Sequence, residues 1–349
     1  MSTITLILLY LISLFNGDRT ISGIYHLLKG KRSSQTIQDG HLYQCLFLFG
    51  ILPRLLRDDL DQVLEELLSN HYIKQESELT YKITKKGEEI LRRELKELDY
   101  IFYLNGWKHK GASTLFWSRL VLTIQSLSCL EAKSHHFFPI IKDEQVKGWV
   151  KKHFPKQSNR KQFSIRLYEE LFFLLSKVSK EEAEIFTYKL SGSHRIGLTN
   201  EQLASMYQKD KEAIQLIHLS IVHRMLDEMQ VNGHQTPFLN TFISDINRSI
   251  QMTNSTRQTY LLMKRGLSLE EIATQRNLKV NTIEDHIVEI MLEDKSLELT
   301  SFIEEEEVEL ISEVIANNSN KKLSDLKKQL PMDISFFKIR LVLARLGER

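Results

Sequence analysis

The sequence predicts a mainly α-helical protein in three segments, 1–100, 101–250 and 251–349. Only five prolines and fourteen glycines interrupt the 349 residues, and the chain is rich in Leu, Ile, Lys and Glu. This composition favours long helices over many short strands. Hydrophobic residues make up 42% of the chain, which is ordinary for a protein with buried cores and excludes a disordered one.

The first element is the apolar run from Ile4 to Phe15. No Lys or Arg precedes it, no small-residue cleavage site follows it, and it is shorter than the roughly 20 residues of a membrane-spanning helix. We therefore expect a buried first helix, no membrane association and a cytoplasmic protein, with association with the nucleoid as an option. Cys45 and Cys129 belong to no CxxC pair, which favours buried free thiols over the alternative of a disulfide between them.

Residues 21–95 are expected to form three helices and a hairpin. The third helix, Arg57–Ser69, carries an apolar stripe and should end at Asn70, a residue that tolerates a left-handed conformation. The segments 71–74 and 80–84 alternate apolar and polar residues, and Gln75 to Leu79 is polar enough for the loop between them. This order, with Thr84 and Gly87 leading into another helix, resembles a winged-helix domain.

In winged-helix domains the wing and the third helix often contact DNA, and here three hairpin lysines would neutralise phosphates: Lys82, Lys85 and Lys86. Two alternatives stay open, a solvated basic hairpin and a winged helix that binds protein.

The middle segment contains the strongest basic cluster of a chain whose formal charge is only +2. From Gln145 to Tyr168 there is no acidic residue, and the cations alternate with Trp149, Phe154 and Phe163. Such a cluster can bind phosphates while rings stack on unpaired bases; the alternative, which we favour, is three core rings beside a solvated basic turn. The candidate contacts are Lys147, Lys151, Lys152, Lys156, Arg160 and Lys161.

Residues 259–290 carry the sharpest pattern, that of a helix-turn-helix. Gly266 can end one helix, Ser268 and Glu271 form a capping box for the next, and Ala273 lets two helices cross closely. Asn277 can adopt the positive φ of the turn, and Asn281 or Thr282 can cap the third helix. Ile272, Leu278, Ile283 and Ile287 would form its small core. The candidate DNA contacts are Arg276, Lys279, Asn281 and Thr282.

From about Thr253 to its end, the chain resembles the helix-turn-helix region at the C-terminus of some RecQ-family helicases and the YpbB-like family of Firmicutes proteins, encoded beside such a helicase. The residues that carry the resemblance are Thr259, Gly266, Ser268, Ile272, Ala273, Arg276, Leu278, Thr282, Ile283 and His286, with a trailing helical pair over 323–346. The resemblance implies DNA as a ligand, a RecQ-type helicase as a partner in trans, and a role in DNA repair or recombination.

Acidic side chains on the third helix of this motif argue against direct reading of DNA, because Glu284, Asp285, Glu289 and Glu293 would repel phosphates. A second resemblance, to response-regulator and sigma-factor helix-turn-helices, is weakened by Arg276, where those proteins have an aliphatic residue. The C-terminal helices carry a further basic set that could meet DNA or an acidic partner: Lys321, Lys322, Lys327, Lys328, Lys338, Arg340 and Arg345.

Catalytic motifs are missing from the sequence. The stretch from Leu28 to Ser33 superficially resembles the end of a phosphate loop. The pattern GxxxxGK[ST], however, needs Gly where Tyr25 stands and Ser or Thr where Arg32 stands, so the chain is not expected to be an ATP-driven motor. No HExxH motif, Cys/His ligand set or nucleophile motif occurs, and consecutive carboxylates at 304–307 point in different directions on a helix. We expect no enzyme activity, no cofactor, no metal and no small-molecule substrate.

The sequence therefore indicates a non-catalytic, DNA-associated accessory protein of a RecQ-type helicase. The alternatives are a helix-turn-helix transcription regulator and a protein adaptor without DNA contact. Single-strand or duplex preference, oligomeric state and the partner-binding domain are left open.

Overall fold

The computed structural model describes residues 1–134, 137–246, 252–318 and 323–346 and divides the chain into two compact units. The middle unit contains residues 1–3 and 95–247, and the terminal unit contains residues 4–94 and 248–349. The first and third expected segments, however, share one unit.

The N-terminal part of the terminal unit begins with the expected buried helix, α1 (Thr3–Phe15), in which Leu8, Leu9 and Leu11 have no exposed surface. It continues through α2 (Ile21–Lys29), α3 (Ser34–Leu42), the short η1 (Leu46–Leu48) and α4 (Arg57–Ser69). The bounds of α4 agree with the predicted third helix. Asn70, however, is not left-handed, because its φ is −80°. His71 takes the positive φ of 57° instead. The side-chain amide of Asn70 donates to the Glu66 carbonyl at 2.8 Å.

A two-stranded antiparallel hairpin follows α4, with β1 (Ile73–Ser77) paired to β2 (Thr80–Ile83) and Ile73 opposite Ile83. The predicted loop was too long, because Gln75, Glu76 and Ser77 extend the first strand. The next helix, α5 (Lys85–Glu94), lies so close to the hairpin that a Cβ at Gly87 would come within 2.0 Å of the Tyr72 carbonyl oxygen. Glycine at this position is therefore required by packing.

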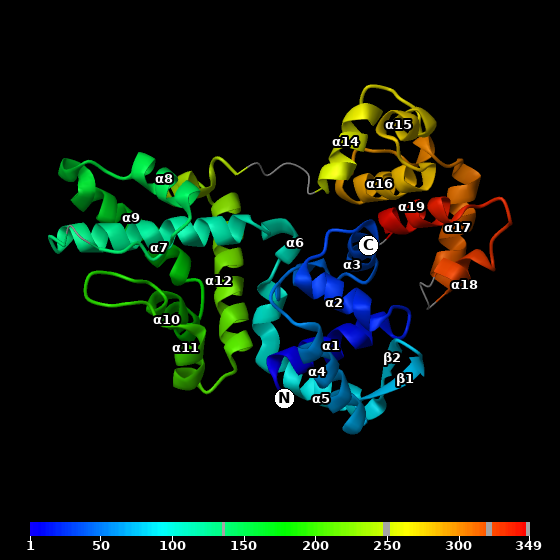
Figure 1. Ribbon diagram of the computed structural model, residues 1–349. Coiled ribbons are helices and arrows are strands. Elements are labelled where there is room, and N and C mark those ends of the chain that lie inside the picture. Colours follow the sequence, from blue (N-terminus) through cyan, green and yellow to red (C-terminus); the bar gives the residue numbers. More distant parts are fainter. Residues whose placement is uncertain (135–136, 247–251, 319–322, 347–349) are drawn as a thin grey trace. The chain divides into compact units, whose positions relative to one another are not determined.

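The C-terminal part of the terminal unit consists of α14 (Asn254–Met263), α15 (Leu269–Arg276), α16 (Val280–Glu293), η5 (Leu299–Ser301), α17 (Glu305–Asn317), α18 (Leu323–Lys327) and α19 (Phe336–Leu346). Helix α16 is central: it contacts α14 and α15 on one side and α19 and α3 on the other, as Figure 1 shows. The N-terminal helix α3 thus completes the packing around the C-terminal motif.

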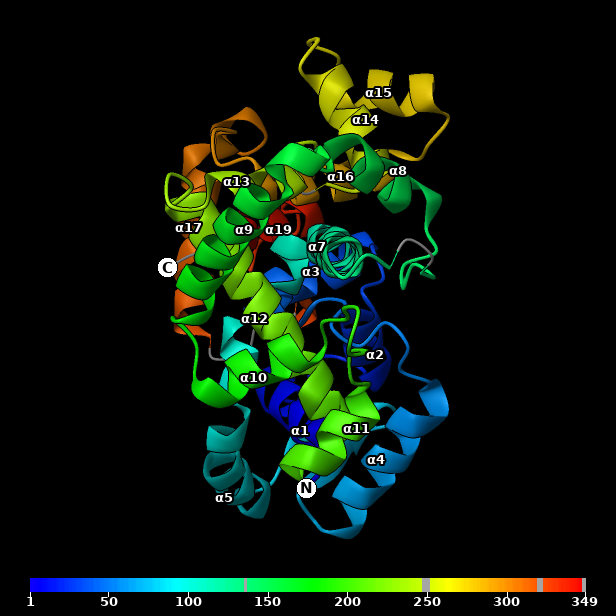
Figure 2. The same ribbon diagram turned by 90° about the vertical axis from the view of Figure 1, so that its left-hand side faces the viewer.

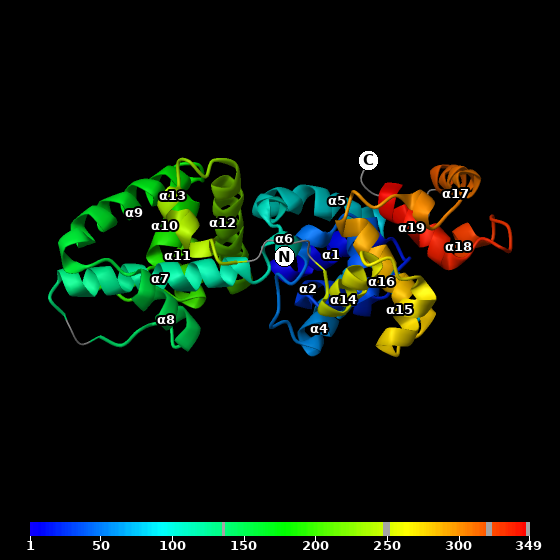
Figure 3. The same ribbon diagram turned by 90° about the horizontal axis from the view of Figure 1, so that it is seen from above.

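The middle unit is helical throughout its described residues: η2 (Leu95–Tyr103), α6 (Gly106–His109), α7 (Ala112–Glu131), α8 (Glu144–His153), η3 (Gln157–Asn159), α9 (Arg160–Leu175), α10 (Lys180–Tyr188), α11 (Asn200–Tyr207), α12 (Lys211–Val231), α13 (Pro237–Asn240) and η4 (Thr241–Ile243). Helices α8 and α9 flank α7, which Figure 2 views end-on and Figure 3 views from above. Capping boxes begin two of these helices, Ser179 with Glu182 at α10 and Thr199 with Gln202 at α11.

Both cysteines, Cys45 and Cys129, are buried free thiols, as expected. Across the described parts of the chain, no helix is both long enough and apolar enough to cross a membrane.

Candidate nucleic-acid interface

The turns of the helix-turn-helix motif form where the sequence predicts them. Gly266, which follows α14, has a φ of 84°. Ser268 and Glu271 make the capping box that begins α15: the Glu271 amide donates to Ser268 Oγ at 3.2 Å, and the Ser268 amide donates to Glu271 Oε2 at 2.8 Å. Asn277 ends α15 in the left-handed conformation with a φ of 52°, which an asparagine tolerates better than most residues.

The small core of the motif is also the predicted one. Ile272, Ile283 and Ile287 have no exposed surface, and Ala273 is 4% exposed where α15 packs against α16. Leu278 is half-buried. The pattern thus fixes the relative placement of α15 and α16 by apolar packing.

The start of α16 differs from the prediction. Lys279 is its N-cap residue, with extended backbone and no side-chain capping bond, so neither Asn281 nor Thr282 caps the helix. Both belong to its first turn, where Lys279, Val280 and Asn281 are exposed and Thr282 is half-buried. The amide groups of such a first turn lack partners within the helix and point outward. This turn is the accessible part of α16.

The remainder of α16 is enclosed by its neighbours. Every residue from His286 to Leu292 is buried, so the helix cannot lie along a groove over its whole length. Among these residues Glu289 is a carboxylate with no exposed surface, so it cannot contact a phosphate. It accepts hydrogen bonds from the Thr253 amide at 2.5 Å and from Thr256 Oγ1 at 2.6 Å. Burial raises the pKa of its carboxyl group, against the lowering effect of these bonds.

Asp285 and Glu293 of α16 also have charged neighbours inside the terminal unit, which corrects the expectation that all four acidic residues face phosphates. Arg340 of α19 pairs with Asp285. Glu284 is half-buried, and burial raises the pKa of its carboxyl group although Arg340 lowers it. His41 Nε2 of α3 lies 3.4 Å from Glu293 Oε1. This role of Arg340 was not predictable from the sequence, because 55 residues separate it from Asp285 and no local signal links the two.

Arg276, a predicted DNA contact, instead connects α15 to α14. Its guanidinium group donates to the Ser255 carbonyl at 2.8 Å, to Ser255 Oγ at 2.9 Å and to Thr259 Oγ1. Thr259 Oγ1 also lies 2.9 Å from His286 Nδ1, and burial, together with Arg276, lowers the pKa of His286 to about 4. Arg276 and the neutral His286 therefore stabilise the motif.

Of the three hairpin lysines, two have intramolecular partners. Lys82 Nζ pairs with Glu76 Oε1 across the hairpin at 2.8 Å. Lys86 Nζ donates to the Asn70 carbonyl at the end of α4 at 2.9 Å and lies 5.1 Å from the centroid of a tyrosine ring. Lys85, at the start of α5, is exposed. The hairpin thus presents less free positive charge than the sequence suggests.

The basic residues of the middle segment are mostly accessible. Lys147 pairs with Glu144 at 2.6 Å, and the Arg160 guanidinium lies 5.8 Å from the Phe154 ring centroid. The remaining four, on α8, before η3 and on α9, are exposed: Lys151, Lys152, Lys156 and Lys161. They form the most accessible of the predicted groups of cations.

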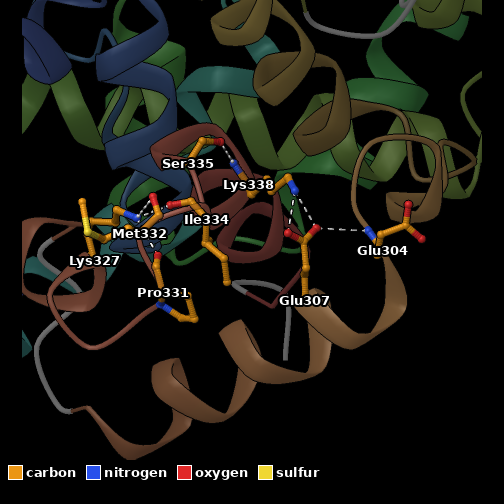
Figure 4. A network of polar contacts seen from close by, with 8 residues as sticks. All are labelled: Glu304, Glu307, Lys327, Pro331, Met332, Ile334, Ser335 and Lys338. Atoms are coloured by element: carbon orange, nitrogen blue, oxygen red, sulfur yellow. Dashed lines mark hydrogen bonds and ion pairs between the residues drawn. The ribbon is translucent and has the colours of Figure 1, made fainter.

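The C-terminal basic set does not form a free surface. Figure 4 shows Lys338 Nζ donating to both carboxylate oxygens of Glu307 at 2.6 Å, and Lys327 Nζ donating to backbone carbonyls that include Pro331 O at 2.8 Å. Arg345 donates to the Leu297 carbonyl. Lys328 pairs with an aspartate, and Lys321 and Lys322 lie outside the described residues. The expected surface is therefore largely engaged in holding α17, α18 and α19.

These features define a helix-turn-helix protein, and residues 255–343 match a protein family described as a helix-turn-helix domain. The match covers α14 to α19, so the trailing helices are part of the domain. The chain is also 33% identical over 331 residues to Protein YpbB of Bacillus subtilis (strain 168), covering 95% of this chain and 94% of that one. The chain belongs to the YpbB family, as the sequence resemblance predicted. No solved structure matches it.

Proposed function

We propose that this chain is a non-catalytic, cytoplasmic DNA-binding protein that acts as an accessory of a RecQ-type helicase in repair or recombination. The observation that carries the DNA-binding part is the first turn of α16, where Lys279 and Asn281 are exposed while Asp285, Glu289 and Glu293 have partners within the unit. The helicase part rests on the resemblance to RecQ C-terminal regions.

The first turn of α16 has the chemistry of a DNA contact. In helix-turn-helix proteins the N-terminal residues of the recognition helix, which corresponds to α16 here, contact base edges. The partial positive charge at the start of a helix and the Lys279 ammonium both favour a phosphate. Asn281 can donate and accept hydrogen bonds with adenine in the major groove. Because only one turn is accessible, we expect modest sequence preference.

The N-terminal hairpin supports a second, weaker contact. We propose that α4, β1, β2 and α5 form a winged-helix-like domain whose exposed Lys85 contributes to DNA binding. In Figure 1 the hairpin and α15 lie at opposite ends of the terminal unit, so the two contacts would involve separate stretches of DNA.

Fluorescence anisotropy of a labelled duplex with the full chain tests the DNA contact. Lys279→Ala should weaken binding and reduce the slope of log K against log salt by about 0.9. Asn281→Ala should weaken binding severalfold and reduce any sequence preference. The control is Lys96→Ala, which removes an exposed lysine of η2 and should leave affinity unchanged. Equal affinity for all four proteins would refute a duplex contact at α16.

A pull-down from nuclease-treated lysate, with partners identified by mass spectrometry, tests the helicase part. Recovery of a RecQ-type helicase is the expected result. If no helicase is recovered and the chain prefers one duplex sequence by orders of magnitude, it is a transcription regulator. If it recovers a partner yet binds no DNA, it is an adaptor.

A further inference from the structure

The three aromatic rings that alternate with the basic residues of the middle segment are not free to stack on bases. The Trp149 ring lies between the guanidinium group of Arg119, 4.3 Å from its centroid, and the His153 ring, stacked at 4.2 Å. Phe163 packs edge-on against Phe238 at 4.3 Å, and Phe154 packs against the small core around Val150. All three rings are half-buried and packed against neighbours within the middle unit.

A different pair of rings, further along α9, is exposed. Tyr168 and Phe172 are 66% and 62% exposed. They lie one turn apart, with centroids 5.9 Å apart and ring planes at 27°. Ile165 is 48% exposed and Lys161 is exposed. The spacings of four, three and four residues place all four side chains on one face of the helix.

The chain segment that leads into this face is strongly positive. Exposed lysines lie on α8, before η3 and in the first turn of α9, and the chain has no acidic residue between 145 and 168. Glu170 of α9 is turned inward, where it accepts hydrogen bonds from the amides of Phe238 at 2.9 Å and Leu239 at 2.7 Å. Glu169 is the exposed carboxylate of α9 and lies beside the aromatic face. An occupant of this face should therefore be an anion that also presents flat apolar surfaces.

We propose that α8, η3 and α9 of the middle unit form a binding site for single-stranded nucleic acid. Bases stack on Tyr168 and Phe172, and phosphates contact the exposed lysines of α8, of the segment before η3 and of the first turn of α9: Lys151, Lys152, Lys156 and Lys161. Single strands combine a charged backbone with exposed base faces, and they are bound by basic grooves with aromatic platforms. A duplex hides its base faces. From Lys161 to Phe172 the helix rises about 16 Å, which suits a short run of nucleotides.

This site goes beyond the proposed duplex contact at α16 and lies in the other unit, so the two can be tested separately. The test measures anisotropy of a labelled oligothymidylate of twenty nucleotides with the full chain. The double variant Tyr168→Ala/Phe172→Ala should raise the Kd about tenfold or more, because each stacked base contributes to binding independently of charge. Its salt dependence should remain that of the unaltered protein.

Two further variants separate stacking from charge and from general loss of apolar surface. The triple variant Lys151→Ala/Lys152→Ala/Lys161→Ala should reduce the salt slope by about 2, at ~0.7 per phosphate contact for single strands. The control Phe138→Ala/Ile196→Ala removes side chains that are 96% and 81% exposed in the same unit and should leave binding unchanged. Duplex affinity, which reports on α16, should be the same for the ring variant and the unaltered protein.

Three outcomes would overturn the proposal. The first is no binding of the oligonucleotide by the unaltered chain. The second is an unchanged Kd for the Tyr168→Ala/Phe172→Ala variant with intact helical circular dichroism, which would leave the face as a protein-docking surface. The third is an equal loss in the Phe138→Ala/Ile196→Ala control. Loss of duplex binding by Lys279→Ala with retained oligothymidylate binding would support both sites independently.

Discussion

Replacement of the buried carboxylate Glu289 by alanine should destabilise α14 more than any other single change in the helix-turn-helix motif. Glu289 is fully buried and holds the start of α14 through the Thr253 amide and Thr256 Oγ1. Thr256 is itself fully buried. In Glu289→Ala both donors lose their acceptor, and water cannot easily replace it.

The magnitude follows from these contacts. A buried donor left without an acceptor costs about 1–3 kcal/mol. Two such donors, one of them only partly enclosed, give about 2–4 kcal/mol. At 1.4 kcal/mol per tenfold change, amide exchange through local opening of α14 should accelerate roughly thirty- to a thousandfold.

Hydrogen–deuterium exchange with mass spectrometry on the full chain measures this directly in peptides that cover 254–263. Peptides of α10 in the middle unit serve as an internal reference. Glu298→Ala is the matched control, because it removes an exposed carboxylate and should not alter exchange in α14. Acceleration of less than about threefold in Glu289→Ala would refute the argument that this side chain holds α14.

The same residue gives a pH dependence. Burial raises the pKa of Glu289 above its usual 4.5. Folding thus favours the protonated form of the carboxyl group. Its contribution to the stability of the fold is fully present below the unfolded pKa and is lost as pH rises through the folded pKa. Glu289→Gln stays neutral at every pH. The protection of α14 in the unaltered protein relative to Glu289→Gln should therefore decrease as the pH rises above about 4.5; a constant difference would contradict the raised pKa.

Three further changes test other parts of the structure. Asn277→Val should cost about 1–2 kcal/mol, because a β-branched residue tolerates the φ of 52° poorly, whereas Asn277→Gly should be nearly neutral; urea unfolding followed by circular dichroism decides. Arg340→Ala should weaken duplex binding severalfold by leaving Asp285 unpaired near the accessible turn of α16, and Arg340→Lys should largely restore it in the anisotropy assay. Arg119→Ala should lower the free energy of unfolding by about 2–3 kcal/mol, because the Arg119 guanidinium donates to the buried Phe242 carbonyl and covers Trp149. Unchanged tryptophan fluorescence and an unchanged free energy of unfolding would contradict this.

Local elements were largely predictable from the sequence because short-range chemistry determines them. The bounds of α4, the capping box of Ser268 with Glu271 and the left-handed Asn277 all depend on residues within one or two turns of each other. Errors arose where two local solutions compete. His71 rather than Asn70 became left-handed, and Lys279 rather than Asn281 or Thr282 became the N-cap of α16.

The candidate site was only partly predictable. Exposed residues such as Lys279 and Asn281 could be named from the motif, but the partners of the charged residues could not. Arg276 lies against Ser255, Lys338 against Glu307, and Arg340 against Asp285, and these pairs are separated by 21 to 55 residues. A charge counted in the sequence is therefore not a charge available to a ligand.

Sequence patterns alone predicted a helical chain, the position of most of its turns and caps, and a helix-turn-helix of the YpbB family, because periodicity and capping act over a few residues. Which side chains face a ligand depends instead on how distant segments pack. Helices α3 and α19 bury most of α16 and contact its Glu293 and Asp285, and the middle unit half-buries Trp149 while it leaves Tyr168 and Phe172 exposed. Burial and pairing depend on segments far apart in the chain, and no local pattern encodes them.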